Sequence, residues 1–217
     1  EMSASLVGSE MCIRDSSVCF NTSLLKYGGD LAVGAMTILT SVMQFAMLPL
    51  QGLAQGAQPI ISYNYGAGNS NRVHRAYRLL LICSVCYAML FCLLIQLFPG
   101  VFAAIFTSNA ELLAFTKPML RIYTLALGLF GIQIACQMTF TALGNAKASI
   151  IVAVMRKFIL LLPLIYMMPH LYTADLTKAV FMAEPVADVL AVAFTGVLFF
   201  FEFRKALRAM PKSEKKS

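Results

Sequence analysis

Five long apolar segments, separated by short polar stretches, dominate the hydrophobicity pattern of this chain. At about 1.5 Å of helical rise per residue, each is long enough to cross a hydrocarbon core of about 30 Å. Lipid offers no partner for backbone N–H and C=O groups, so such segments are expected to be helices. The pattern therefore predicts an all-α, polytopic transmembrane helix bundle, with about five spanning helices over residues 30–65, 76–98, 118–143, 148–168 and 177–203.

The first segment carries a stripe of polar residues as well. They recur at three- and four-residue steps, which places them on one face of a helix: Thr37, Ser41, Gln44, Gln51, Gln55, Gln58 and Ser62. Polar groups within lipid face either a neighbouring helix, where they form hydrogen bonds, or a cavity that contains water. The stripe alone leaves both interpretations open.

Glycine and asparagine mark contacts and ends around this segment. Gly52 and Gly56 form a small-xxx-small pair, which permits close contact between helices. The segment stops at Gly66-Ala67-Gly68-Asn69, a typical glycine stop. Residues 101–117 are less apolar, and we expect a short interfacial helix there, capped by Ser108 or Asn109.

Two later segments contain polar side chains one helical turn apart. Gln133 and Gln137 form a second polar face, which either hydrogen-bonds to a neighbouring helix or lines a cavity. Glu184 and Asp188 share the face of another helix, and two carboxylates inside an apolar helix suit a proton relay or a cation site. Alternatively, Glu184 lies near the outer interface and pairs with Lys178.

The fourth segment contains Arg156 and Lys157 well inside its predicted limits. The favoured interpretation is that residues 148–155 extend into the cytoplasm and that these bases mark the membrane surface. In the alternative, Arg156 faces the bundle and pairs with an acid.

Composition supports a membrane protein and argues against several other classes. The chain is 59% hydrophobic and 12% charged, with a mean hydropathy of +0.77, outside the range of soluble domains. Its net charge of +7 comes from bases between and after the apolar segments, which indicates membrane orientation and not nucleic-acid binding. The cysteines show no metal-binding spacing, and no catalytic motif is present. We therefore expect no metal, no cofactor and no enzymatic activity.

The distribution of bases predicts orientation and boundaries. Most bases lie at one set of segment ends and in the C-terminal tail, which the positive-inside rule makes cytoplasmic. Five spans then place the N-terminus outside, and a missing upstream helix explains this, so we expect a fragment. Residues 1–16 lack the features of a signal peptide and are expected to be a non-native leader. We expect residues 17–29 to be the remnant of a preceding helix or loop, 30–205 to be the transmembrane part, and 206–217 to be a basic cytoplasmic tail.

Several sequence motifs resemble one transporter family. PLQGLAQGAQPIISYNYGAGN at residues 49–69 resembles the motif that closes the second helix of the C-terminal lobe in the multidrug and toxic compound extrusion (MATE) family. Three further motifs are similar to the last three helices of its bacterial members: ALGNAKAS at 142–149, RKFILLLP at 156–163 and AEPVADVL at 183–190. That family has twelve helices in two lobes, so the resemblance implies a partial C-terminal lobe over residues 30–205 and a missing N-terminal lobe.

The resemblance also implies a function. Such transporters lie in the bacterial inner membrane and expel cationic, amphipathic drugs in exchange for protons or sodium, by alternating access. By position, four residues belong to the motif that shapes the inner helix of the lobe, namely Gln55, Gln58, Tyr63 and Asn64. Gln133 and Gln137 fall on a helix that lines the cavity, and we expect Gln44 and Gln51 of the stripe to line it as well. Glu184 and Asp188 are local candidates for the coupling-ion site.

Two alternative functions remain at this point. A lipid-linked saccharide flippase of the same superfamily is expected to line its cavity with bases, whereas the clearly intramembrane polar groups here are mostly amides and acids. That difference favours a cationic small-molecule substrate. A non-transporting membrane scaffold is the third interpretation, in which the polar faces only hold helices together.

Overall fold

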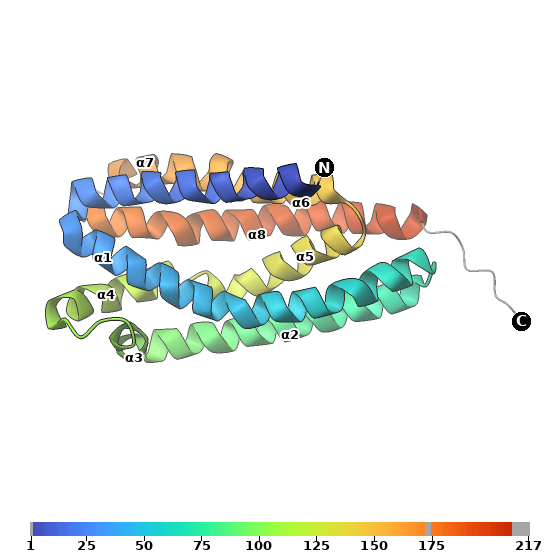
Figure 1. The fold of residues 1–217 in the computed structure, drawn as a ribbon, viewed down its shortest axis with the longest axis horizontal. Coiled ribbons are helices and arrows are strands. Elements are labelled where there is room, and N and C mark those ends of the chain that lie inside the picture. The colour runs from blue at the N-terminus through green and yellow to red at the C-terminus, as the bar shows by residue number, and fades with distance from the viewer. Residues whose placement is uncertain (1, 172–174, 210–217) are drawn as a thin grey trace, which may run out of the picture.

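The computed structural model describes residues 2–171 and 175–209, with side chains from residue 18 onward except at 19, 146 and 209. All regular structure in this part of the chain is helical (Figure 1). The elements are α1 (Met2–Gly66), α2 (Ser70–Leu97), α3 (Pro99–Ala104), α4 (Ala110–Tyr123), the 3₁₀ turn η1 (Leu127–Leu129), α5 (Phe130–Ala142), α6 (Ala146–Val154), the π-helical segment η2 (Met155–Leu161), α7 (Leu162–Leu171) and α8 (Leu176–Ala209).

A sharp bend divides α1 into two antiparallel parts. Gly29 has φ 62° and ψ −161°, a conformation that glycine adopts without the steric cost of a Cβ atom. The part before Gly29 lies beside α7, and the part after it crosses back to the opposite end of the bundle (Figure 1). Residues 17–29 are therefore helical, and Phe20 and Leu24 are buried in the main core.

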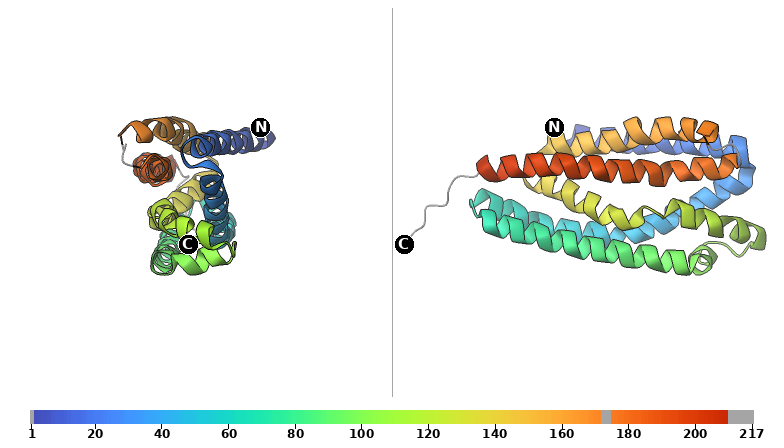
Figure 2. Two further views of the ribbon diagram at one scale, coloured as in Figure 1. Left: turned by 90° about the vertical axis from the view of Figure 1, so that its left-hand side faces the viewer. Right: turned by 180° about the vertical axis from the view of Figure 1, so that it is seen from behind.

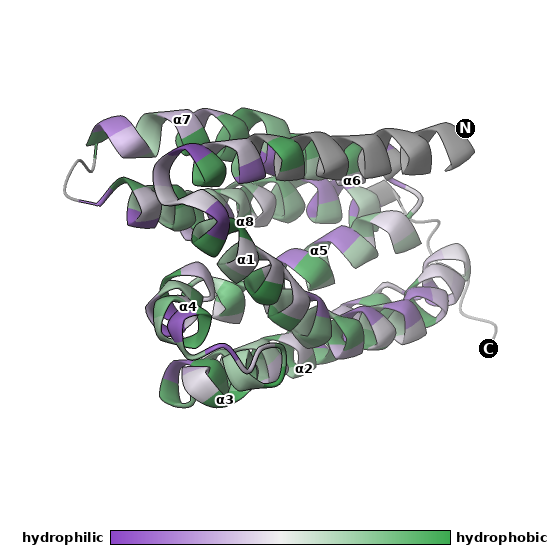
Figure 3. Cartoon of the chain, turned by 60° about the vertical axis from the view of Figure 1, so that its left-hand side comes forward, coloured by the Kyte–Doolittle hydropathy of each residue, from purple (hydrophilic) through white to green (hydrophobic). Residues whose placement is uncertain are grey.

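The remaining long helices continue this antiparallel arrangement, as the end and rear views show (Figure 2). Four described helices are long and apolar enough to cross a membrane, and a fifth is added if the bent pair Ala110–Tyr123 and Leu127–Ala142 is one span. Hydrophobic residues cover most of α2 and α7 (Figure 3). The all-α, polytopic prediction is thereby confirmed.

The third span begins earlier than the sequence pattern predicts and is bent by 42° near η1. Asn109 caps α4, because its Oδ1 accepts hydrogen bonds from the backbone N–H groups of Glu111 and Leu112 at 2.9 and 3.3 Å. The predicted leader at residues 1–16 has no described side chains, and residues 210–217 of the predicted tail lie outside the described part, so both remain predictions.

Close helix contact occurs at a different glycine from the predicted pair. A Cβ added at Gly131 in α5 would lie 2.5 Å from the backbone oxygen of Ser84 in α2, so only glycine fits there without a shift. By contrast, nothing lies within 4 Å of a Cβ added at Gly52 or Gly56. The pair permits a close helix contact, but none is formed there among the described residues.

Candidate functional site

Arg156 in η2 faces the bundle and pairs with two acids of α8, Glu184 and Asp188. Its Nε donates to Asp188 Oδ1 at 2.7 Å, and its Nη2 donates to Glu184 Oε1 at 3.2 Å. The guanidinium carbon lies 4.6 Å from the centroid of the Phe130 ring, in cation–π geometry. The favoured prediction, that Arg156 marks the membrane surface, is wrong, and the alternative pairing with an acid is confirmed.

Lys157 completes a charged cluster with Arg156, Glu184 and Asp188. Its Nζ lies 3.8 Å from Glu184 Oε1, an ion pair that is longer than either contact of Arg156. Glu184 is 5% exposed and Asp188 is 2% exposed, so each carboxylate has lost most of its hydration. Burying an unpaired charge costs several kcal/mol, so each acid needs its basic partner.

The local backbone of η2 helps to place two neighbouring bases beside α8. A π-helical segment is wider than an α-helix, so consecutive side chains diverge less around its axis. Met155–Leu161 forms such a segment, and both Arg156 and Lys157 lie within it. π-helical segments occur frequently at functional sites.

Glu184 does not form the predicted interfacial pair with Lys178. Lys178 Nζ lies 3.0 Å from Asp175 Oδ2 instead, at the start of α8. The backbone N–H of Lys178 also donates to Asp175 Oδ1 at 3.1 Å, and this bond holds the pKa of Asp175 below its usual range. Glu184 lies two helical turns further along α8, where it faces a cavity.

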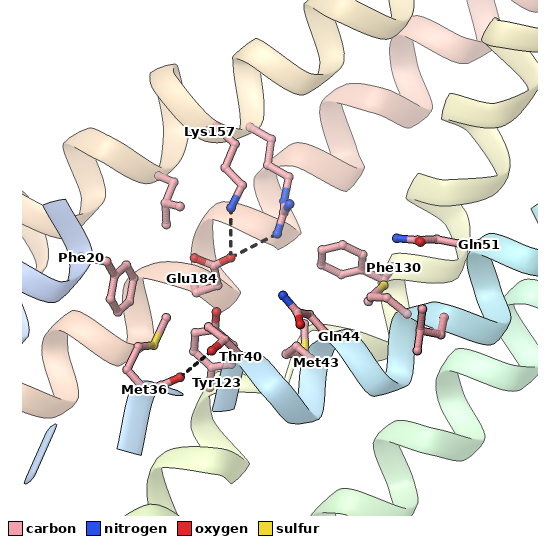
Figure 4. A pocket seen from close by; sticks show the side chains of 14 residues that line it. Phe20, Met36, Thr40, Met43, Gln44, Gln51, Tyr123, Phe130, Lys157 and Glu184 are labelled. Atoms are coloured by element: carbon pink, nitrogen blue, oxygen red, sulfur yellow. Dashed lines mark hydrogen bonds and ion pairs between the residues drawn. The ribbon is translucent and has the colours of Figure 1, made fainter. Parts of the chain in front are cut away.

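A cavity of about 580 Å³ lies between α1, η2 and α8 (Figure 4). Methionine and aromatic side chains form much of its wall. The polar residues that line it are Thr40, Gln44, Gln51, Tyr123, Arg156, Lys157 and Glu184. Two predicted cavity-lining residues, Gln44 and Gln51, are therefore placed opposite the charged cluster, whereas Asp188 lies behind the wall.

The other predicted residues on α1 do not line this cavity. Gln55 is exposed and Gln58 is half-buried, both closer to the end of α1 at Gly66. Tyr63 is 76% exposed. Asn64 is buried, and its Nδ2 donates to the backbone oxygen of Ile60 at 2.8 Å. The end of the stripe thus differs from its middle. Its last residue, Ser62, donates from Oγ to the backbone oxygen of Ala142 in α5 at 2.8 Å, which agrees with the interhelical hydrogen-bonding interpretation.

The glutamines of α5 have separate environments. Gln133 is buried, and its Oε1 accepts a hydrogen bond from the Thr195 hydroxyl of α8 at 3.2 Å. This contact agrees with the interhelical hydrogen-bonding interpretation. Gln137 is half-buried, and it is not among the residues that line the 580 Å³ cavity.

Tyr123 and Phe130 are cavity residues that the sequence analysis missed. Both precede the polar face of α5 in sequence and carry no spacing that distinguishes them from core aromatics. The pairing of Arg156 had a usable signal, because two bases and two acids within apolar helices balance one another in charge. Among the described residues, no group of three or more His, Cys, Asp or Glu could hold a metal ion.

Comparison with known proteins identifies the family. The family model MatE matches residues 9–167. A FAD transporter of Shewanella oneidensis is 25% identical over 159 residues, which cover 73% of this chain and 34% of that protein. The multidrug export protein MepA of Staphylococcus saprophyticus is 22% identical over 185 residues, covering 84% of this chain and 40% of the relative. The chain thus spans between a third and two-fifths of these curated relatives.

Solved structures share the fold. An inward-facing MATE family transporter of the MOP superfamily matches 94% of this chain and 47% of its own, with a TM-score of 0.86 at 17% identity. A Vibrio cholerae MATE transporter matches 93% of this chain and 45% of its own, with a TM-score of 0.83 at 22% identity. By the family match, which covers more than half of its residues, this chain belongs to the MatE family of multidrug and toxic compound extrusion transporters, whose members are transporters and not enzymes.

Proposed function

We propose that the complete protein exports amphipathic organic molecules by secondary active transport, and that this chain contributes part of the lobe that binds them. The observation that carries this proposal is the cavity of about 580 Å³, which combines apolar walls with a buried charged cluster. Its size lies within the range of small-molecule sites. The names of two relatives, a multidrug export protein and a FAD transporter, support an organic substrate.

In this proposal, Gln44 and Gln51 contact the substrate, because both line the cavity. The remaining predicted residues, Gln55, Gln58, Tyr63, Asn64, Gln133 and Gln137, act elsewhere: those on α1 lie toward its far end, where a missing N-terminal lobe would meet them in another state of the cycle. Alternating access requires such surfaces, since the path must open at each end in turn.

Glu184 and Asp188 are the proposed coupling site, with a proton as the coupling ion. A proton neutralises one carboxylate and leaves Arg156 paired with the other, which changes the contacts between η2 and α8. A sodium ion at the same acids would lie beside Arg156 and Lys157, where repulsion between cations disfavours it. The arrangement therefore favours proton over sodium antiport.

The proposed location is the bacterial inner membrane, with the C-terminus cytoplasmic. The basic residues around the α1–α2 turn and at the end of α8 gather at one end of the bundle, as expected for a cytoplasmic face.

A lipid-linked saccharide flippase is the second candidate, and one observation favours it. The sequence argument against it rests on the lack of intramembrane bases, and the position of Arg156 and Lys157 at the cavity removes that premise. The same position weakens the preference for a cationic substrate, because both cavity bases would repel one.

Export can be tested by expressing the complete gene in a bacterial host that lacks its own efflux pumps. We expect reduced accumulation of amphipathic dyes, lost when the proton gradient is collapsed and retained in sodium-free buffer. Asp188→Asn should abolish most export, whereas Gln137→Ala, outside the cavity, should keep it. Accumulation equal to that of the empty vector would reject export and favour the flippase or a scaffold; persistence only with sodium would reject proton coupling.

A further inference from the structure

The charged cluster has no net charge, because it contains two bases and two acids. The residues of the cluster that face the cavity carry a net positive charge. Arg156, Lys157 and Glu184 line the cavity, whereas Asp188 lies behind it and is only 2% exposed. The wall therefore presents two positive charges and one negative charge to a bound molecule. A site of this kind attracts an anionic group more strongly than a cationic one.

The two bases differ in how firmly they are held. Arg156 makes hydrogen bonds of 2.7 and 3.2 Å to the two acids, so these contacts fix the position of its guanidinium group. Within the described part of the chain, the contact of Lys157 with an acid is the 3.8 Å ion pair with Glu184, which exceeds the distance of a hydrogen bond. An ammonium group carries three donors, so Lys157 has donor capacity left for a ligand. Among the cluster, Lys157 is the residue whose partner is most easily exchanged.

The rest of the wall suits a planar, apolar body beside this anion-binding group. The rings of Phe20, Tyr123 and Phe130 line the cavity together with methionines, and Gln44 adds an amide on the opposite side (Figure 4). Aromatic rings and thioethers pack well against aromatic ligands.

We propose that Lys157 binds an anionic group of the substrate, such as a carboxylate, sulfonate or phosphate. The preferred cargo is then an aromatic organic anion, or a zwitterion whose cation approaches Glu184, and not a simple organic cation. This inference rests on the proposed function, because it assumes that the cavity is the substrate site.

A binding experiment on the purified complete transporter in lipid nanodiscs tests this without any gradient. Two dyes share one skeleton and differ by a sulfonate: 1-anilinonaphthalene-8-sulfonate and the uncharged N-phenyl-1-naphthylamine. Removing a charge-assisted contact should weaken sulfonate binding in Lys157→Gln by roughly tenfold or more, while binding of the uncharged dye changes by less than about twofold. Lys157→Arg should restore sulfonate binding, and Lys147→Gln, an exposed lysine at the basic end of the bundle, should not affect it.

Lys157→Gln is expected to fold, since Arg156 still pairs with both acids. Equal weakening of both dyes, or the same loss in Lys147→Gln, would overturn the proposal, as would tighter binding of cationic ethidium than of the sulfonate. Because no transport is measured, a failure of export with a Lys157-dependent preference for the sulfonate would reject the proposed function and leave the anion site standing.

Discussion

Arg156 is the residue on which the charged cluster depends, because it pairs with both buried acids. Replacing it by methionine keeps much of the volume and leaves Asp188 without its 2.7 Å partner. We expect Arg156→Met to lower the free energy of unfolding by about 3–5 kcal/mol, the usual cost of breaking a buried ion pair. Chemical unfolding of the purified protein in bicelles measures this loss.

Two further variants separate the charge from the packing. Lys157→Met should cost much less, because its 3.8 Å contact is longer and Glu184 keeps Arg156 as a partner. Adding Asp188→Asn to Arg156→Met removes the unpaired charge and should recover part of the stability. Equal losses for Arg156→Met and Lys157→Met would contradict the central role of Arg156.

The hydrogen bond between Thr195 and Gln133 tests the role of a polar side chain that only joins helices. The coupling energy between Thr195→Val and Gln133→Leu should be roughly 0.6 kcal/mol and at most about 1.7 kcal/mol, as for such bonds within membranes. A double-mutant cycle measures the coupling. If either substitution abolished export without a change in stability, these residues would have a direct role in transport.

For individual residues, the sequence predicts which side chains belong to the candidate site better than it predicts their contacts. The four-residue spacing of Glu184 and Asp188 identifies their shared face, and of the two interpretations of the stripe on α1, the cavity interpretation describes Gln44 and Gln51. The partner of the acids is ambiguous in the sequence, since an extension of residues 148–155 into the cytoplasm would place Arg156 at the membrane surface instead of inside the bundle. Only the position of η2 against α8 decides between these environments.

Among the elements, α5 packs tightly against α2 at Gly131. Gly131→Ala would place a methyl group 2.5 Å from the backbone oxygen of Ser84, which cannot rotate away as a side chain does. We expect a loss of about 1–3 kcal/mol, typical of overpacking. Gly56→Ala is the matched control: nothing lies near its Cβ, so it should be neutral or stabilise α1 by up to about 1 kcal/mol. Thermal unfolding distinguishes the two, and the opposite order would contradict the contact.

The limits of the helices follow from local signals, whereas bends and contacts do not. Asn109 caps α4, as one of the two residues predicted for that role, because a side-chain acceptor at this position satisfies free backbone N–H groups. The small-xxx-small pattern at Gly52 and Gly56 does not locate a helix contact, because small residues only permit close approach and do not determine which helix packs there. Which helix surface meets a neighbour depends on packing over distant parts of the chain, as at Gly131 and Ser84.

For the whole molecule, the antiparallel arrangement divides the connections between two ends of the bundle. The turn at Gly66–Ser70 and the end of α8 lie at one end, and the connection between α3 and α4 and the start of α8 lie at the other (Figure 1). The first end carries more basic residues than the second. It holds Arg72, Arg75, Arg78, Lys147, Arg204, Lys205 and Arg208, whereas the second holds Lys26, Lys117, Arg121 and Lys178.

This asymmetry predicts a cytoplasmic first end by the positive-inside rule. Fusing green fluorescent protein after Ala67 should give fluorescence, and fusing alkaline phosphatase after Ser108 should give enzyme activity outside the inner membrane. Exchanging the two reporters provides the control, since each should then be silent. The reverse pattern of reporter signals would contradict the prediction, because it would place the basic end of the bundle outside the cytoplasm.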